Sequence, residues 1–169
     1  ERGLFDAVFI ADFTSSIDEA TIDGFRRMTY SASFEPLTLL SALAATTDKI
    51  GLIGTVSTTY SVPYHLARQF LSLDQISGGR AGWNLVTTAN VKESIHYGRP
   101  SHVPHADRYQ QAREFAQIVQ SFWDSWDDNA FQRDTESGEF FRPEGRRPFD
   151  FKGEFLSAAG QIDIPRSPQ

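Results

Sequence analysis

Residues 78–90 read GGRAGWNLVTTAN, and this stretch indicates how the rest of the chain folds. Gly78 and Gly79 are typical of the end of a helix, and the apolar run at 81–87 is typical of a buried strand. The strand then gives way to hydroxyl and amide side chains at 87–90. A helix that stops just before a buried strand with a polar end is the pattern of an α/β sheet.

The same alternation extends toward the N-terminus. Apolar runs at 7–11 and 51–59 predict two more buried strands, the first with the profile of a strand covered on both faces. Helices are predicted to begin at Pro36 and Pro63, because proline fits the first turn of a helix. The segment at 13–34, between the first strand and the first helix, is polar and irregular.

Toward the C-terminus, a loop rich in turn residues at 90–104 leads into a helix predicted over 105–126. One wide apolar stripe that includes Tyr109 runs along this helix, so we expect it to pack against a sheet. The segment at 127–147 predicts a loop, and 149–164 predicts a short hairpin. Alternating strands and helices imply parallel strands with right-handed crossovers, in an open doubly wound sheet or in a closed barrel.

Polar side chains stand at the end of each predicted strand. They are Asp12 after the first, Ser57, Thr58 and Thr59 after the second, and Thr87, Thr88 and Asn90 after the third. In both kinds of α/β fold, ligands bind at the carboxyl ends of the strands. We therefore expect these side chains to face one rim.

The composition limits the classes of partner. The 169 residues carry a formal net charge of -6, which argues against a broad phosphate-binding face and predicts no nucleic-acid partner. The absence of cysteine excludes disulfides, thiolate metal sites and cysteine nucleophiles. No apolar run is long enough to span a bilayer and no signal-peptide pattern opens the chain. These features predict a cytoplasmic protein without a membrane partner.

Familiar catalytic motifs do not occur. No GxxxxGK[ST] loop, GxSxG elbow or HExxH pair is present, and Gly78 precedes a strand where a dinucleotide-binding glycine follows one. His96, His102 and His105 lie close together in sequence, but histidines in loops are more often simply polar. We therefore predict no metal site.

Three separated phrases resemble the flavin-dependent monooxygenases of the bacterial luciferase-like superfamily. They are VSTTYSVPYHLARQFLSLDQISGGRAGWNLVTT, HADRYQQAREFAQIVQSFWDSW and FKGEFLSAAGQIDIPRSPQ. The nearest branch is that of nitrilotriacetate monooxygenase component A and dibenzothiophene-sulfone monooxygenase. The resemblance implies a TIM barrel with large insertions, which forms a homodimer or homotetramer.

The resemblance also implies a reaction. Reduced FMN (FMNH2), supplied by a separate NAD(P)H:FMN reductase, reacts with O2 to form a C4a-hydroperoxide. One oxygen atom then enters a small organic substrate, and the other leaves as water. Because the cofactor performs the difficult step, the protein needs few dedicated acids or bases, and no catalytic side chain is identified.

Family roles fall on seven positions of this sequence. The resemblance places the flavin against Asp12, Thr55, Ser57, Asn84, Thr87, His105 and Tyr109. Asp12 matches an acid at the rim, and Asn84 matches an inward amide that bonds the polar edge of the ring, whereas Trp83 is predicted to pack outward. His105 and Tyr109 are four positions apart, on one face of the long helix. The alternative interpretation makes Asp12 a cap, Thr55 an ordinary strand residue and Tyr109 a core residue.

The length departs from the family pattern. A TIM barrel has eight strands, whereas three barrel strands are predicted here, so residues 1–169 read as one N-terminal part of a barrel. We expect the first strand to precede Glu1, the later strands to follow Gln169, and the chain alone to be inactive. A deazaflavin-dependent relative that transfers hydride and a non-catalytic module remain the alternatives. A set of side chains in the polar segment is expected to shape the substrate pocket: Phe25, Met28, Tyr30 and Phe34.

Overall fold

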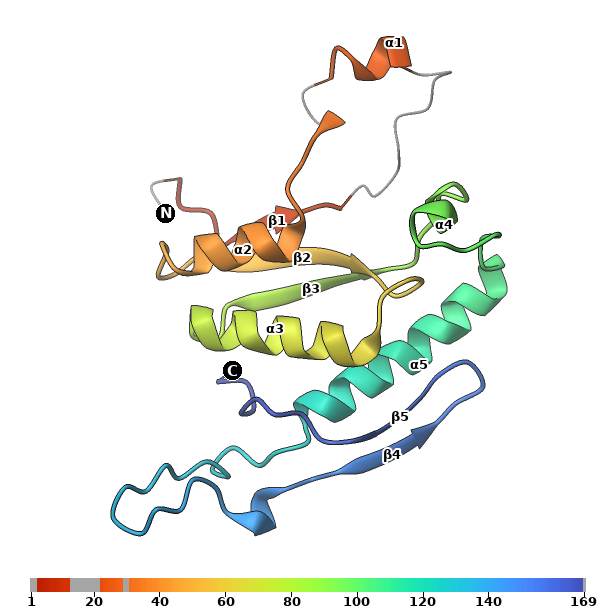
Figure 1. The fold of residues 1–169 in the computed structure, drawn as a ribbon. Helices are drawn as coiled ribbons and strands as arrows, with labels where there is room; N and C mark the ends of the chain where they lie inside the picture. The colour runs from red at the N-terminus through yellow and green to blue at the C-terminus, as the bar shows by residue number, and fades with distance from the viewer. Residues whose placement is uncertain (1–2, 13–21, 29–30, 169) are drawn as a thin grey trace.

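The computed structural model describes residues 3–12, 22–28 and 31–168 (Figure 1). Within them, strands β1 (Ala7–Ile10), β2 (Gly51–Ser57) and β3 (Ala81–Val86) form a parallel sheet in the order β1-β2-β3. The three predicted strands are confirmed, although each ends slightly before its predicted limit. Across the described residues the sheet does not close on itself, so these strands form an open part of an α/β fold.

Helices α2 (Pro36–Ala44) and α3 (Pro63–Ser77) connect the strands, as the two prolines predicted. Gly54 of β2 faces both helices: a Cβ atom built on it would lie 3.0 Å from Leu40 of α2 and 3.8 Å from Phe70 of α3. The missing side chain therefore lets the helical layer approach the sheet closely. The helix layer and the sheet enclose the core, in which Leu40, Leu52 and Leu66 are almost fully buried.

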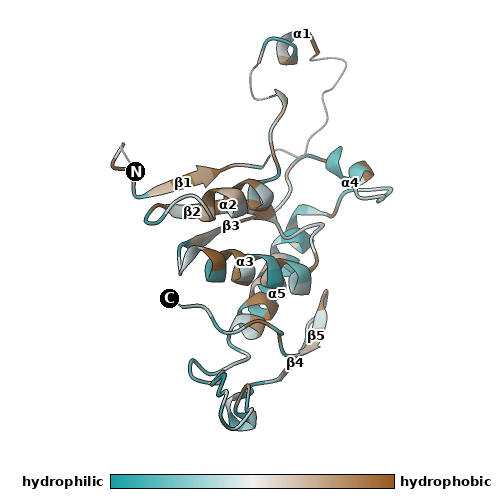
Figure 2. Cartoon of the chain, turned by 60° about the vertical axis from the view of Figure 1, so that its left-hand side comes forward, coloured by the Kyte–Doolittle hydropathy of each residue, from teal (hydrophilic) through white to brown (hydrophobic). Residues whose placement is uncertain are grey.

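The opposite face of the sheet is uncovered by any described element. Ile53 and Thr55 flank Gly54 and therefore point to this second face, together with their register partners Phe9 and Asn84. Phe9 is 53% exposed, so the expectation that β1 is covered on both faces is wrong for this chain. Figure 2 shows β1 as a hydrophobic strand at one edge of the sheet. We call this surface the inner face.

Arg80 joins the ends of both connecting helices at the start of β3. Its guanidinium donates to the carbonyl oxygens of Ala44 and Thr47 at the end of α2 and to that of Ser77 at the end of α3. It also donates to the Ile50 carbonyl at 2.7 Å, just before β2, and to the Thr47 hydroxyl. One side chain thus satisfies carbonyls that the two helix ends leave without intrahelical partners.

The long helix is α5 (His105–Trp123), which begins as predicted and ends three residues earlier. It packs mainly against α3, not against the sheet; its contact with β3 runs through Trp83, whose ring lies 6.0 Å from that of Phe115. Trp83 therefore packs outward, as predicted. Tyr109 is 54% exposed, so its place in the apolar stripe, and the alternative that makes it a core residue, are wrong. Tyr109 belongs to the first turns of α5, which extend past α3.

Strands β4 (Phe149–Lys152) and β5 (Ser157–Gly160) form the predicted hairpin, which packs on α5. The Glu114 carboxylate on α5 accepts three consecutive backbone N–H bonds from residues 154–156 in the hairpin turn, at 2.8, 2.9 and 2.8 Å. The 127–147 segment is a loop, as predicted, with a short 3-10 turn, η3 (Pro143–Gly145).

Two short helices stand in the segments that the sequence predicts as irregular. They are α1 (Ile22–Phe25), before α2, and α4 (Glu93–His96), after β3. Figure 1 shows the arrows of β1, β2 and β3 pointing toward the side where α4 and the start of α5 lie. The carboxyl ends of the strands therefore meet at one rim, with α4 and the N-terminus of α5 beside it.

Candidate functional site

The rim begins with a pair of polar side chains on the inner face. Thr55 and Asn84 are register partners on β2 and β3, and the Asn84 Nδ2 donates to the Thr55 Oγ1 at 3.0 Å. Thr55 is buried and Asn84 is half-buried. Among the described residues, no hydrogen bond reaches the Asn84 side-chain carbonyl, so this amide keeps an acceptor for a ligand.

Hydroxyl groups connect the ends of β2 and β3. The Ser57 Oγ and the Thr88 Oγ1 lie 2.7 Å apart, and the backbone N–H of Thr88 donates to the Thr59 Oγ1 at 3.1 Å. Thr58 donates to the carbonyl of Val86. Thr87 is half-buried beside this cluster. Four of the predicted polar residues thus link the ends of β2 and β3: Ser57, Thr58, Thr59 and Thr88. Asn90 instead accepts the backbone N–H of Lys92.

Asp12 lies two residues beyond β1. Burial raises the pKa of its carboxyl group above the ordinary value, and the negative charges of Glu35 and Glu93 raise it further. Glu35 caps α2, accepting the N–H groups of Leu37 and Thr38 at 2.9 and 2.7 Å, and Glu93 opens α4. Asp12 is thus held among other acids at the rim, where it binds a proton more readily than a solvated aspartate does.

His105 and Tyr109 lie together at the start of α5. Their ring centroids are 4.8 Å apart, which confirms that they share a face of the helix, and both side chains are exposed. Pro104, the residue before the helix, makes no side-chain capping bond, so the N–H groups of the first turn are not capped by it. The positive end of the helix dipole adds to their attraction for an anionic group.

Three residues outside the seven predicted flavin contacts connect these parts; the sequence analysis considered one of them, His102, only as a metal ligand. The Tyr60 hydroxyl lies 2.7 Å from the Nδ1 of His102, and the His102 Nε2 lies 2.6 Å from the Nη1 of Arg108. The same Nη1 donates to the Thr88 carbonyl. Arg108 is 8% exposed, and its Nε is buried without a hydrogen-bond partner among the described residues. The three residues thus bond the end of β2, the loop before α5 and α5 itself to the end of β3.

The sequence contained one signal for this group. Arg108 is four and seven positions before Ala112 and Phe115, which belong to the buried stripe of α5. A cation in line with that stripe predicts a buried guanidinium and therefore a polar partner nearby. Tyr60 and His102 gave no comparable signal, because each lies in a loop and the two are 42 positions apart in sequence.

The described histidine and carboxylate side chains do not gather into a metal site. No cluster of three histidine, aspartate, glutamate or cysteine side chains suited to a metal ion occurs in the part of the chain that the structure describes. His102 bonds Tyr60 and Arg108, and His105 contacts Tyr109. No described helix is both long enough and apolar enough to cross a membrane.

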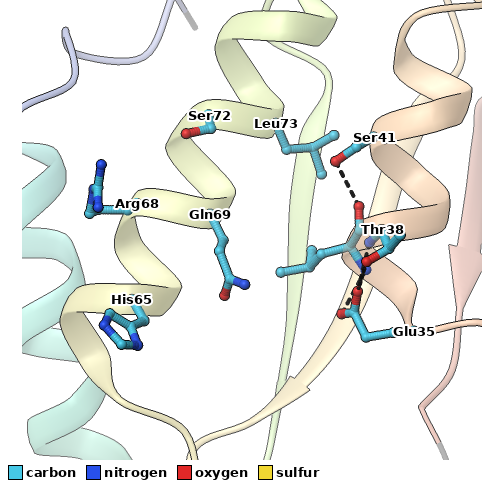
Figure 3. A pocket seen from close by; sticks show the side chains of 9 residues that line it. Glu35, Thr38, Ser41, His65, Arg68, Gln69, Ser72 and Leu73 are labelled. Atoms are coloured by element: carbon cyan, nitrogen blue, oxygen red, sulfur yellow. Dashed lines mark hydrogen bonds between the residues drawn. The ribbon is translucent and has the colours of Figure 1, made fainter.

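A groove of about 410 Å³ lies between α2 and α3, away from the predicted site residues (Figure 3). Two of its charged side chains already have partners, since Glu35 caps α2 and Arg68 pairs with Asp163 at 3.1 Å. None of the seven predicted flavin-contacting residues lines it. The rim therefore remains the better candidate for the functional site.

The substrate pocket expected from the polar segment is described only in part. Tyr30 lies outside the described residues. Phe34 is 76% exposed and Met28 is 42% exposed, so apolar side chains of this segment face solvent. Both side chains are free to contact a ligand, but no described contact joins either of them to the residues of the rim.

Comparison with known proteins gives a consistent result. The family described as luciferase-like monooxygenase matches residues 5–169. N-acetyl-S-(2-succino)cysteine monooxygenase of Bacillus subtilis (strain 168) is 47% identical over all of this chain and 37% of its own length. Nitrilotriacetate monooxygenase component A of Aminobacter aminovorans is 42% identical over all of this chain and 39% of its own length.

A solved structure agrees with these relatives. The crystal structure of riboflavin lyase (RcaE), with modified FMN and riboflavin, superposes with a TM-score of 0.85 at 32% identity over 97% of this chain and 37% of that one. The chain thus spans well under half the length of the proteins it matches. The match over nearly the whole chain shows that this protein belongs to the luciferase-like monooxygenase family.

Proposed function

We propose that this chain supplies the first flavin-contacting part of an FMN-dependent monooxygenase with a TIM barrel, which inserts one oxygen atom from O2 into a small organic substrate. The observation that supports this proposal is that the Thr55–Asn84 and Ser57–Thr88 pairs join β2 to β3 toward their carboxyl ends, while Asp12 follows the carboxyl end of the parallel strand β1. Family membership supports the reaction class. The structure of riboflavin lyase with modified FMN supports the cofactor.

The residues at the rim fit an isoalloxazine ring chemically. Such a ring has apolar faces and an edge of alternating N–H and C=O groups. The inner face offers Phe9 and Ile53 as apolar contacts, and Asn84 offers a side-chain carbonyl that no described residue bonds. FMNH2, when bound, activates O2 and supplies the reducing electrons, so no separate metal or acid is needed for that chemistry.

The protein's own residues then bind and orient the cofactor. Asn84 bonds the polar edge of the ring, with Thr55 fixing the orientation of the amide through their hydrogen bond. Ser57 and Thr87 line the rim, and Asp12, whose pKa is raised, holds a proton beside the ring more readily than a solvated acid. His105 and Tyr109, on the uncapped start of α5, contact the polar tail of FMN.

The substrate class follows from the relatives only as a proposal. The two relatives named above are named for N-acetyl-S-(2-succino)cysteine and nitrilotriacetate, which both carry several carboxylates. We infer a small organic substrate and use these two compounds as probes. A separate NAD(P)H:FMN reductase supplies the reduced flavin, and the complete protein assembles as a homodimer or homotetramer.

The test uses the complete protein encoded by the reading frame that contains this chain. Reduced FMN is titrated anaerobically while flavin fluorescence is followed, and the bound form is then mixed with O2 and either probe. We expect saturable binding and a hydroxylated or cleaved product that carries one atom of labelled oxygen from O2. No saturation at high flavin concentration would refute the proposal.

A further inference from the structure

We propose that Arg108, His102 and Tyr60 form one directed hydrogen-bond relay, in which Arg108 and His102 position the Tyr60 hydroxyl to donate to an oxygen atom of the ligand bound at the rim. Here we call these three residues the relay. This inference rests on the proposed function, because that function identifies reduced FMN and an organic substrate as the ligands. It adds the Tyr60 hydroxyl as a hydrogen-bond donor to the ligand, at a position outside the seven predicted flavin contacts.

The direction of the relay follows from the chemistry of arginine. A guanidinium has only hydrogen-bond donors, so the Arg108 Nη1 donates to the His102 Nε2 across 2.6 Å. The Nε2 is therefore the accepting nitrogen, and the ring proton is on Nδ1. That Nδ1–H donates to the Tyr60 oxygen across 2.7 Å. Tyr60 accepts from His102, so its own hydroxyl hydrogen points elsewhere.

Arg108 has features that packing alone does not require. It is 8% exposed, and none of the ion pairs among the described residues involves it. Burying a cation without a carboxylate partner costs free energy. The bond from Arg108 Nη1 to the Thr88 carbonyl offsets only part of this cost. At the head of a directed chain, however, a buried cation polarises each following bond and makes the last hydroxyl a stronger donor.

Tyr60 has a place suited to a ligand. It follows Thr58 and Thr59 at the end of β2, is half-buried, and its ring stacks on that of Tyr97 with centroids 4.6 Å apart and planes 16° apart. The stack fixes the plane of the ring. Tyr60 directly follows Thr59, whose hydroxyl accepts the N–H of Thr88 at 3.1 Å, so Tyr60 lies next to the hydroxyl groups of the rim.

The Tyr60 hydroxyl hydrogen has no acceptor among the described residues. The one described bond of this hydroxyl is the contact with His102, in which the imidazole supplies the hydrogen. A flavin or substrate oxygen that carries negative charge is a strong acceptor and would take the Tyr60 hydrogen on binding.

The test compares Tyr60→Phe with Tyr64→Phe in the complete protein. Tyr60→Phe keeps the stacked ring and removes only the hydroxyl, and Tyr64→Phe makes the same change on α3, where the ring packs against Phe122. Two quantities are measured: the Kd for reduced FMN without substrate, and the KM for N-acetyl-S-(2-succino)cysteine or nitrilotriacetate. We expect Tyr60→Phe to raise one of them about tenfold and Tyr64→Phe to leave both within about twofold.

The two quantities distinguish the source of the acceptor oxygen. A rise in the Kd places it on the flavin, and a rise in the KM alone places it on the substrate. His102→Leu on its own should produce the same loss, and adding it to Tyr60→Phe should cause little more, because both changes break one relay. Melting temperatures close to that of the unaltered protein confirm that each variant is folded.

The negative outcomes are separable. If the unaltered protein binds reduced FMN and Tyr60→Phe changes neither quantity, the relay is wrong and the proposed function stands. Additive losses for His102→Leu and Tyr60→Phe also overturn the relay, since independent structural effects would add. If the unaltered protein fails to bind reduced FMN, the proposed function and the relay are both overturned.

Discussion

Replacing Arg80 is the sharpest test of how this fold holds its two connecting helices. Its guanidinium makes five hydrogen bonds, four of them to backbone carbonyls at the ends of α2 and α3 and just before β2. Arg80→Ala leaves all of these acceptors without their donor. The half-buried position of the side chain means that water replaces only some of the lost bonds.

The expected loss can be worked from these bonds. A hydrogen bond that involves a charged group contributes about 1.5 to 3 kcal/mol, and bonds to one side chain do not add fully. With partial replacement by water, we expect Arg80→Ala to lower the free energy of unfolding by about 3 to 4 kcal/mol. Arg80→Lys keeps the charge but not the planar fork, so it should recover about half of that loss.

Urea denaturation of the complete protein measures this change, and Arg113→Ala is the matched control. Arg113 is an exposed arginine on α5 for which the described residues show no hydrogen bond, so its removal should cost less than about 0.5 kcal/mol. Hydrogen exchange should also show faster exchange in the last turns of α2 and α3 for Arg80→Ala. A loss of about 1 kcal/mol or less would refute the claim that one side chain holds both helix ends.

Three further changes test the site and the hairpin. Asn84→Ala should raise the Kd for reduced FMN about tenfold in a flavin fluorescence titration; an unchanged Kd would make Asn84 a partner of Thr55 only. For Glu114, burial raises the pKa but the three backbone N–H bonds outweigh it and lower the pKa overall. The ionised Glu114 therefore stabilises the fold fully above the ordinary glutamate pKa of about 4.3, and this stabilisation is lost as the pH falls through the lowered pKa. In Glu114→Gln, the melting temperature should no longer fall over this pH range for that reason. Asp12→Asn should raise the melting temperature at pH 7 while weakening flavin binding; a lower melting temperature would contradict the burial penalty at Asp12.

The elements that the sequence predicted well are those with strong local signals. Proline at the first turn fixed the starts of α2 and α3, and Gly78, with a left-handed φ of 69°, marked the end of α3. Trp83 was predicted to pack outward while Asn84 points inward, and Trp83 packs against three aromatic rings on that side. For the prolines and Gly78, the residue that carries the signal acts within or next to its own element.

The parts that sequence reasoning missed depend on residues distant along the chain. Tyr60, His102 and Arg108 come from three segments, which meet where the first turn of α5 reaches the ends of β2 and β3. Tyr109 shows the converse error, since helical periodicity placed it in the apolar stripe, whereas it is 54% exposed. The buried face of α5 runs through Arg108, Ala112 and Phe115, and Tyr109 lies beside that face.

The Asp12 prediction follows from the sign of its pKa shift. Burial and two neighbouring carboxylates raise the pKa, so the folded chain binds the proton more tightly than the unfolded chain. Stability is therefore gained as the pH falls through the raised pKa, and at pH 7 the ionised Asp12 destabilises the fold. A surface cap would carry no such penalty, and capping acids usually have a lowered pKa because N–H groups bond them. An acid kept at a destabilising position just beyond the carboxyl end of β1 is better explained by binding than by folding, because functional sites often retain groups that reduce stability.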